Sequence, residues 1–162
     1  MAVALSPDKT TLAMALQGTI WTIPVEGGKA KSVTDEMGDS QEPDWSPDGE
    51  KIVFHSYRDG TYHIYTINKD GSDLTQLTSG ISDDREPDWS PDGKSIIFSS
   101  DRSGNYDIWH IDLTSKTLKQ LTSDPANDSN PAFSNSGAKI AFVSQRTESG
   151  IYILENGVEK LA

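Results

Sequence analysis

Short segments rich in β-branched and aromatic residues recur along the whole chain, and Gly, Pro, Asp and Asn residues separate them. In 51–56 and 95–100, for example, apolar and polar side chains partly alternate, which is typical of β-strands. No stretch has the period of an amphipathic helix. The pattern therefore predicts an all-β chain with strands at 3–5, 12–16, 19–25, 30–34, 43–46, 51–56, 62–67, 74–78, 87–90, 95–100, 106–111, 118–122, 131–134, 139–144, 150–154 and 158–161.

These strands fall into four groups because the chain repeats itself. Glu-Pro-Asp-Trp-Ser-Pro-Asp-Gly stands at 42–49 and again at 86–93, and degraded copies stand at 4–9 and 131–137. The shared serines are spaced by 40, 44 and 44 residues: Ser6, Ser46, Ser90 and Ser134. Repeats of about 40–45 residues with four strands each are typical of β-propellers. We therefore expect a single domain over 1–162, an all-β propeller of four four-stranded antiparallel blades at about 1–36, 37–80, 81–124 and 125–162.

The repeated Ser-Pro-Asp-Gly has the composition of a tight turn. Pro presets φ at the second position, Asp bonds nearby backbone, and Gly takes the last position. We expect this turn to join the innermost strand of each blade to the second. Trp45 and Trp89, with Leu5 and Phe133 as counterparts, are expected to pack between neighbouring blades. A second aromatic row is also expected to be core: Trp21, Tyr65, Trp109 and Tyr152.

Charge and composition narrow the choice of partners. The chain has 14 basic and 25 acidic residues and a net charge of −11. Nucleic acid and anionic membranes need a basic face, so neither is expected as a partner. The absence of Cys excludes disulfides, thiolate catalysis and cysteine-ligated zinc. No apolar run approaches the length of a membrane span, and residues 1–3 lead into the first repeat without the pattern of a signal peptide.

Charged residues recur at the predicted blade connections. Arg58, Arg102 and Arg146 are spaced by 44 residues and fall in the hairpins between second and third strands. The predicted loops between blades carry acidic residues on the same side: Glu42, Asp84, Glu86 and Asp128. One interpretation is a ring of charges that binds a polar protein partner or a cation. The other is that each Arg pairs with a carboxylate and stiffens the loops, which the strict period and the fork of the guanidinium favour. All seven are candidate partner-binding residues.

The search for catalytic or metal-binding residues yields little. Asp44 and Asp88 occupy matched positions on inner strands, where inward carboxylates could bind Ca²⁺ in a central channel, although turn hydrogen bonds are the alternative. His55, His63 and His110 fall at different repeat positions and lack metal-ligand spacing. No nucleophile elbow and no phosphate-binding Gly loop occurs. We therefore predict no catalytic residue, no metal and no cofactor, with Ca²⁺ as the alternative.

The repeats resemble those of the TolB-like propeller family, also called WD40-like or PD40 repeats. The segments that carry the likeness are 45–56, 89–109, 76–78 and 120–122. The resemblance implies one of two settings. One is the protein-interaction propeller of the periplasmic Tol system, and the other is the N-terminal propeller of a secreted amidohydrolase or peptidase, which residues 18–30 resemble most. A periplasmic or secreted location follows from the resemblance alone.

Propellers of this family usually have six or more blades, whereas four are expected here. We therefore expect a homodimer in which two chains form an eight-bladed ring. The function that the sequence favours is a non-catalytic scaffold that binds a protein partner. The alternative is an accessory or gating propeller belonging to a larger amidohydrolase or peptidase. A third interpretation is an enzyme with a carboxylate–cation site in the channel, which a bound metal would support.

Overall fold

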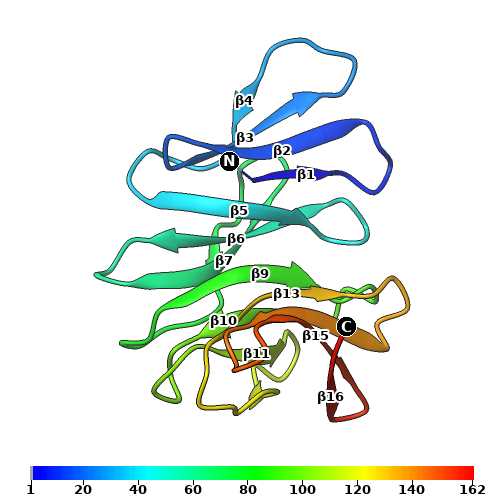
Figure 1. Ribbon diagram of the computed structural model, residues 1–162. Coiled ribbons are helices and arrows are strands. Elements are labelled where there is room, and N and C mark those ends of the chain that lie inside the picture. Colours follow the sequence, from blue (N-terminus) through cyan, green and yellow to red (C-terminus); the bar gives the residue numbers. More distant parts are fainter. Residues whose placement is uncertain (1) are drawn as a thin grey trace. The chain divides into compact units, whose positions relative to one another are not determined.

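The computed structural model describes residues 2–162, and every regular element in that range is a β-strand (Figure 1). The strands form four antiparallel sheets of four strands each, which we call blades 1 to 4. The described residues fall into two compact units, one ending at Ile81 and the other beginning at Ser82. Residues 2–162 contain no helix that could cross a membrane. The predicted all-β class and the four four-stranded blades are confirmed, whereas the single domain over 1–162 stays a prediction.

The first unit holds blades 1 and 2, and in each of them the strands pair in chain order. Blade 1 consists of β1 (Val3–Leu5), β2 (Thr11–Leu16), β3 (Thr19–Pro24) and β4 (Lys31–Ser32). Blade 2 consists of β5 (Asp39–Trp45), β6 (Lys51–Tyr57), β7 (Tyr62–Asn68) and β8 (Thr75–Gln76). The outermost strands are shorter than the sequence predicts, and a short edge strand offers few unpaired backbone groups to other chains.

The second unit holds blades 3 and 4 with the same strand order. Blade 3 consists of β9 (Asp84–Trp89), β10 (Ser95–Ser100), β11 (Asp107–Asp112) and β12 (Leu118–Gln120). Blade 4 consists of β13 (Asp128–Phe133), β14 (Lys139–Ser144), β15 (Gly150–Glu155) and β16 (Val158–Leu161). The middle strands lie within a residue or two of their predicted positions.

The inner strands β5, β9 and β13 begin earlier than predicted. Each contains a register shift against its partner strand, as expected for a β-bulge. The residues at the shift have positive φ angles of 50°, 56° and 53°: Glu42, Glu86 and Asn130. The placement of Glu42, Asp84, Glu86 and Asp128 in loops between blades was therefore wrong, because the chain is already paired in the sheet there.

The Ser-Pro-Asp-Gly turn joins the inner strand to the second strand, as predicted. In blade 2, Asp48 Oδ1 accepts hydrogen bonds from Ser46 Oγ at 2.6 Å and from the Glu50 amide at 3.0 Å. The Gly49 amide donates to the Ser46 carbonyl at 2.8 Å, and the Lys51 amide donates to Ser46 Oγ at 2.9 Å. Every partner lies within five residues of Ser46, so the motif builds this turn from local contacts.

The core of the first unit lies between its two blades. The blade 2 side chains that face blade 1 are almost fully buried: Trp45, Ile52, Phe54, Tyr65 and Ile67. They pack on blade 1 residues: Ala4, Ala13, Ala15, Ile20 and Val33. Trp45 Nε1 also donates to the Ala4 carbonyl at 3.3 Å. The predicted position of Trp45 between neighbouring blades is confirmed.

The second unit repeats this packing with other residues. The core side chains of blades 3 and 4 are Ile97, Ile108, Ile140, Phe142, Tyr152 and Leu154, with Phe133 against them. Three residues at the two predicted core rows behave differently from the prediction. Leu5 is 49% exposed instead of packed between blades, and Trp21 and Trp109 are only half-buried.

Candidate functional site

The candidate arginines lie in the hairpins between the second and third strands of blades 2, 3 and 4, as predicted. Their side chains are largely covered, with exposed fractions of 17%, 15% and 15% for Arg58, Arg102 and Arg146. A guanidinium buried to this extent needs partners that compensate its charge. The partners of each arginine therefore decide what the hairpins can do.

The three arginines stack on the second aromatic row of their own blades. The guanidinium carbon lies 5.5 Å from the ring centre of Tyr65 for Arg58, and 5.0 Å from that of Trp109 for Arg102. For Arg146 the distance to the Tyr152 ring is 4.7 Å. Cation–π attraction favours such contacts. The prediction that this row is core packing is thus only partly right, since its rings also hold the arginines.

Blades 3 and 4 pair their arginines with a fully buried carboxylate at the start of the inner strand. Arg102 Nη2 lies 2.7 Å from Asp84 Oδ1, and Arg146 Nη2 lies 2.9 Å from Asp128 Oδ2. Both aspartates have an exposed fraction of 0%. These pairs join the hairpin to the inner strand of the same sheet. They agree with the interpretation in which each arginine pairs with a carboxylate and stiffens the loops.

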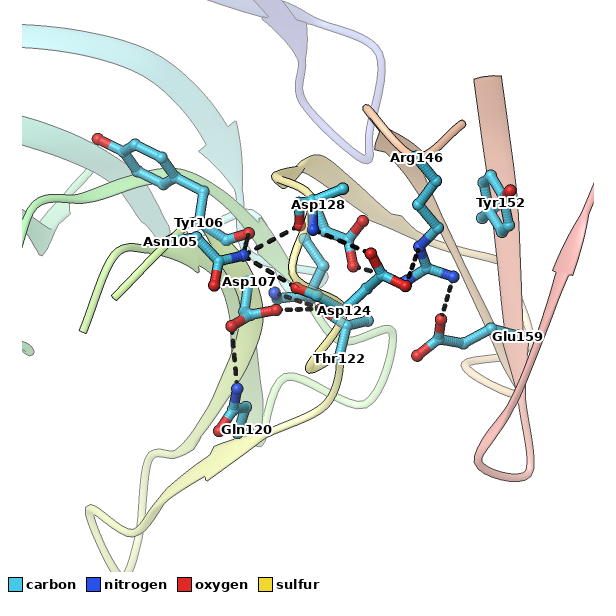
Figure 2. Close-up of polar contacts among 12 residues, drawn as sticks. Asn105, Tyr106, Asp107, Gln120, Thr122, Asp124, Asp128, Arg146, Tyr152 and Glu159 are labelled. Atoms are coloured by element: carbon cyan, nitrogen blue, oxygen red, sulfur yellow. Dashed lines mark hydrogen bonds and ion pairs between the residues drawn. The ribbon is translucent and has the colours of Figure 1, made fainter. Parts of the chain in front are cut away.

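Arg146 has the largest set of acidic partners, and Figure 2 shows them around its guanidinium. Nε lies 3.3 Å from Asp124 Oδ2, and Nη1 lies 2.5 Å from Glu159 Oε2. Burial opposes the charge of Arg146, but the hydrogen bond to Glu159 and the charge of Asp128 raise its pKa above its ordinary value. The three carboxylates come from β13, from the loop before it and from β16, so Arg146 ties the outer and inner edges of blade 4 together.

Blade 2 holds its arginine differently. Ser40 replaces the buried aspartate, and its hydroxyl lies 3.0 Å from that of Ser56. Arg58 Nη2 instead reaches Asp35 Oδ1 at 2.9 Å, and the Asp35 side chain is 53% exposed. Gly38 lies against this pair, because a Cβ built there would collide with Ser56 Oγ and lie 3.0 Å from Arg58 Nε. The same repeat position thus carries a buried pair in two blades and a half-exposed pair in the third.

Two acidic side chains of the inner strand of blade 3, Glu86 and Asp88, bond to blade 4. In the second unit, Glu86 Oε2 accepts from Ser99 Oγ at 2.6 Å and from the Asn130 amide of blade 4 at 2.7 Å. Asp88 Oδ2 accepts from the Phe133 amide at 2.7 Å. In the first unit, Glu42 Oε2 lies 3.9 Å from His55 Nδ1. Glu86 and Asp88 therefore satisfy backbone donors of the next inner strand, a use of Asp88 that the sequence did not reveal.

Asp107 is a buried carboxylate that the sequence analysis missed. It is 1% exposed at the start of β11 and accepts a hydrogen bond from Ser103 Oγ at 2.5 Å. It also accepts one from Gln120 Nε2 at 2.9 Å (Figure 2). Burial raises its pKa above the ordinary 3.8, and the charge of Asp128 adds to this effect. The sequence Asp-Ile-Trp at 107–109 could have pointed to Asp107. However, blade 2 has His63 at the same repeat position, so the aspartate does not recur with the repeats.

The histidines do not meet at one place. His55 and His63 are 4% and 2% exposed within blade 2. His110 lines a groove of about 570 Å³ at the turn end of the second unit, beside Asp92 and Phe133, and burial lowers its pKa. Among residues 2–162, no group of three or more His, Asp or Glu side chains could hold a metal ion. The Ca²⁺ alternative stays a prediction.

Comparisons with known proteins agree with this architecture. Residues 4–106 match the family described as the Tricorn protease N-terminal beta propeller domain. Residues 85–160 match the TolB beta propeller domain family. The two matches together span blades 1 to 4, and both families are propellers, as the repeats indicate.

Solved structures show the same fold. The structure of putative TolB from Agrobacterium tumefaciens has a TM-score of 0.90 and 26% identity over 98% of this chain. TolB from Acinetobacter baumannii has a TM-score of 0.84 and 26% identity over 99% of this chain. Puromycin hydrolase, at 19% identity and a TM-score of 0.77 over 97% of this chain, shares the fold. The chain spans 63%, 42% and 29% of these three proteins respectively.

Proposed function

The chain belongs to the family of the Tricorn protease N-terminal beta propeller domain, and from this premise we propose that it is a non-catalytic propeller that binds a protein partner. The observation that carries the proposal is the pairing of the periodic arginines. Arg58, Arg102 and Arg146 are spent on ion pairs and ring stacking within their own blades. Such contacts hold hairpins in fixed positions, which suits a binding surface better than a reacting group.

The proposed binding surface is the hairpin end of the blades. Each unit has such an end of its own. Arg58 shapes it from within in the first unit, and the pairs of Arg102 with Asp84 and of Arg146 with Asp128 shape it in the second. Glu42 and Glu86 lie in the bulges of the inner strands. Exposed hairpin residues such as Asp59 and Ser103 would make the contacts themselves. A net charge of −11 favours a partner with a basic surface.

A second candidate function is supported by the likeness to puromycin hydrolase, of which this chain spans 29%. There the chain would be the accessory propeller of a larger peptidase or amidohydrolase, and its surface would face a catalytic domain rather than a separate partner. A periplasmic or secreted location belongs to both proposals and rests on the likeness to TolB.

Two measurements test the non-catalytic role and the surface. The purified chain should release no product from peptide or aminoacyl-amide substrates, and an activity that follows the chain through purification would overturn the role. A photo-cross-linking residue at Asp59, in the hairpin after β6, should capture a basic protein from the source cells. The control probe at Glu50, at the opposite end of β6, is equally exposed and should capture none. Equal capture from both ends would refute the hairpin surface.

A further inference from the structure

The alternation of side chains gives every blade two faces. In blade 1 the strand register places six apolar side chains on one side of the sheet. Val3 lies opposite Met14, which lies opposite Trp21. Leu5 lies opposite Leu12, which lies opposite Ile23. We call this side the back face, and its members are Val3, Leu5, Leu12, Met14, Trp21 and Ile23. The residues between them point to the other side of the sheet, which we call the front face: Ala4, Ala13, Ala15 and Ile20.

Inside the first unit, the back face of blade 2 packs on the front face of blade 1. The blade 2 residues at the back-face positions are all in that core: Trp45, Ile52, Phe54, Tyr65 and Ile67. Their register is the same, since Trp45 pairs with Ile52 and Ile52 with Ile67. The front face of blade 1 receives them through its alanines and Ile20.

The second unit follows the same rule. The back face of blade 4 supplies Ile140, Phe142, Tyr152 and Leu154, with Phe133 beside them. The front face of blade 3 receives them through Ile97 and Ile108. Two independent interfaces in one chain therefore use one arrangement, in which a back face covers the front face of the preceding blade.

Two other blade faces, one in each unit, carry exposed apolar side chains. On the back face of blade 1, Val3 and Leu5 are each 49% exposed. On the front face of blade 4, Val143 and Ile151 pair across β14 and β15 and are 40% and 56% exposed. Exposed apolar patches of this kind commonly mark interaction sites.

One of these two faces is a back face and the other is a front face, which are the two kinds of face that pack together inside each unit. Blade 4 has Ala132 and Ala141 at the repeat positions of Ala4 and Ala13, the alanines on which the back face of blade 2 packs. The front face of blade 4 thus has the same small residues as a front face that already receives a back face in this molecule. The chain carries both halves of the contact that its own blades use.

We propose that the front face of blade 4 in one copy of this chain binds the back face of blade 1 in a second copy. The inference rests on the proposed role as a protein-binding propeller and names one partner, a second copy. The contact joins different surfaces of the two copies, so repetition closes a ring or extends a chain. Two copies joined by this contact would form the homodimer that the sequence favours.

The first experiment measures mass by sedimentation velocity over a wide dilution range for the full chain and two variants. Leu5→Lys places a charge on the back face of blade 1, and Ile151→Lys places one on the front face of blade 4. Each should raise the dissociation constant by at least about tenfold, because a lysine would be desolvated in the contact. Leu74→Lys and Ile81→Lys are matched controls at exposed positions outside both faces, and they should dimerise like the unchanged chain.

Mixing the two variants separates this contact from others. L5K retains an intact blade 4 face and I151K retains an intact blade 1 face, so the mixture should form a one-to-one complex although each variant alone is monomeric. A contact between two identical faces would leave one of the variants dimeric and would overturn the proposal. A monomeric unchanged chain would also overturn it. Far-ultraviolet circular dichroism checks that both variants fold.

The two experiments distinguish a failure of this contact from a failure of the hairpin surface. A monomer that still captures a basic protein through the hairpin probe would keep the function and refute the second copy. A dimer without hairpin capture would keep this contact and refute the hairpin surface.

Discussion

The two ends of blades 2 and 3 are stabilised in different ways. At the turn end, the hydroxyl and carboxylate of the Ser-Pro-Asp-Gly motif bond within a few residues, as Ser46 to Asp48 at 2.6 Å and Ser90 to Asp92 at 2.7 Å. At the hairpin end, Arg102 pairs with Asp84 across 18 residues, and Arg58 pairs with Asp35 across 23. The turn end is therefore a local structure and the hairpin end a tertiary one.

This difference explains why the serine–aspartate bond of the turn recurs in blades 1, 2 and 3, while the partner of the arginine at the hairpin end varies. A local turn needs only its own residues, so copying the motif copies the structure. A tertiary pair depends on what the inner strand and the preceding loop offer at that point. Blade 2 offers Ser40 and Asp35, blade 3 offers Asp84, and blade 4 offers Asp128. The arginine is the constant member, and its partner is free to change.

The largest effect is expected at the buried pair of blade 4. Arg146→Met should lower the free energy of unfolding by about 3–5 kcal/mol, because it leaves the fully buried Asp128 without its counter-charge. Urea unfolding followed by tryptophan fluorescence measures the loss. A decrease below about 1 kcal/mol would mean that the pair contributes little to stability.

A second substitution tests this result by copying into blade 4 the serine pair that blade 2 has in place of a buried ion pair. Adding Asp128→Ser to Arg146→Met removes the buried charge and places a hydroxyl opposite Ser144, as Ser40 lies opposite Ser56. The double variant should recover most of the lost stability, since removing both members of a buried pair is often nearly neutral. A double variant no more stable than R146M would show that the other contacts of Arg146 dominate.

Arg58→Met should cost less, although it changes the same repeat position. The partner Asp35 is 53% exposed, so its charge stays hydrated when Arg58 is removed. The ion pair itself contributes about 0–1 kcal/mol, to which lost stacking on Tyr65 is added. The same urea measurement should place R58M clearly above R146M in stability. Equal losses would contradict the distinction between buried and half-exposed pairs.

The same contrast decides what the sequence could reveal. The spacing of Ser6, Ser46, Ser90 and Ser134 was enough to predict four blades, because each motif folds from its own residues. The row of arginines predicted the hairpins in the same way. The partners of the arginines could not be assigned. They depend on where the inner strands begin and on the bulges at Glu42 and Glu86, which the sequence analysis did not predict.

The burial of individual members of a repeat was also beyond the sequence. Trp45 and Leu5 occupy equivalent positions, yet one is 6% and the other 49% exposed. The difference lies in whether another blade covers the back face, which is a property of the assembly and not of the strand. Asp107 was missed for a related reason, because its neighbours Gln120 and Ser103 come from separate segments of blade 3.

The smallest effects are expected in the response to acid, where the two ends of the blades should behave oppositely. At the turn end, the hydrogen bonds from Ser46 and the Glu50 amide lower the pKa of Asp48 below its ordinary 3.8. At the hairpin end, burial raises the pKa of Asp107 above 3.8. A carboxyl with a lowered pKa stabilises the folded chain above the unfolded pKa and loses this contribution as pH falls through the folded value. A carboxyl with a raised pKa binds protons more tightly in the folded chain, so it lowers stability as pH rises through that range.

Two variants separate these opposing contributions. Asp48→Asn keeps an oxygen for the turn and removes the titrating group, so the free energy of unfolding should fall less steeply between about pH 4 and pH 2 than in the unchanged chain. Asp107→Asn should change the slope in the other direction, because it removes the group whose protonation favours the folded state as pH falls. Urea unfolding over a series of acidic buffers measures both slopes. Since Asp48 lies at an exposed turn and Asp107 is 1% exposed, slopes that move in the same direction would show that burial at the hairpin end does not govern the titration of Asp107.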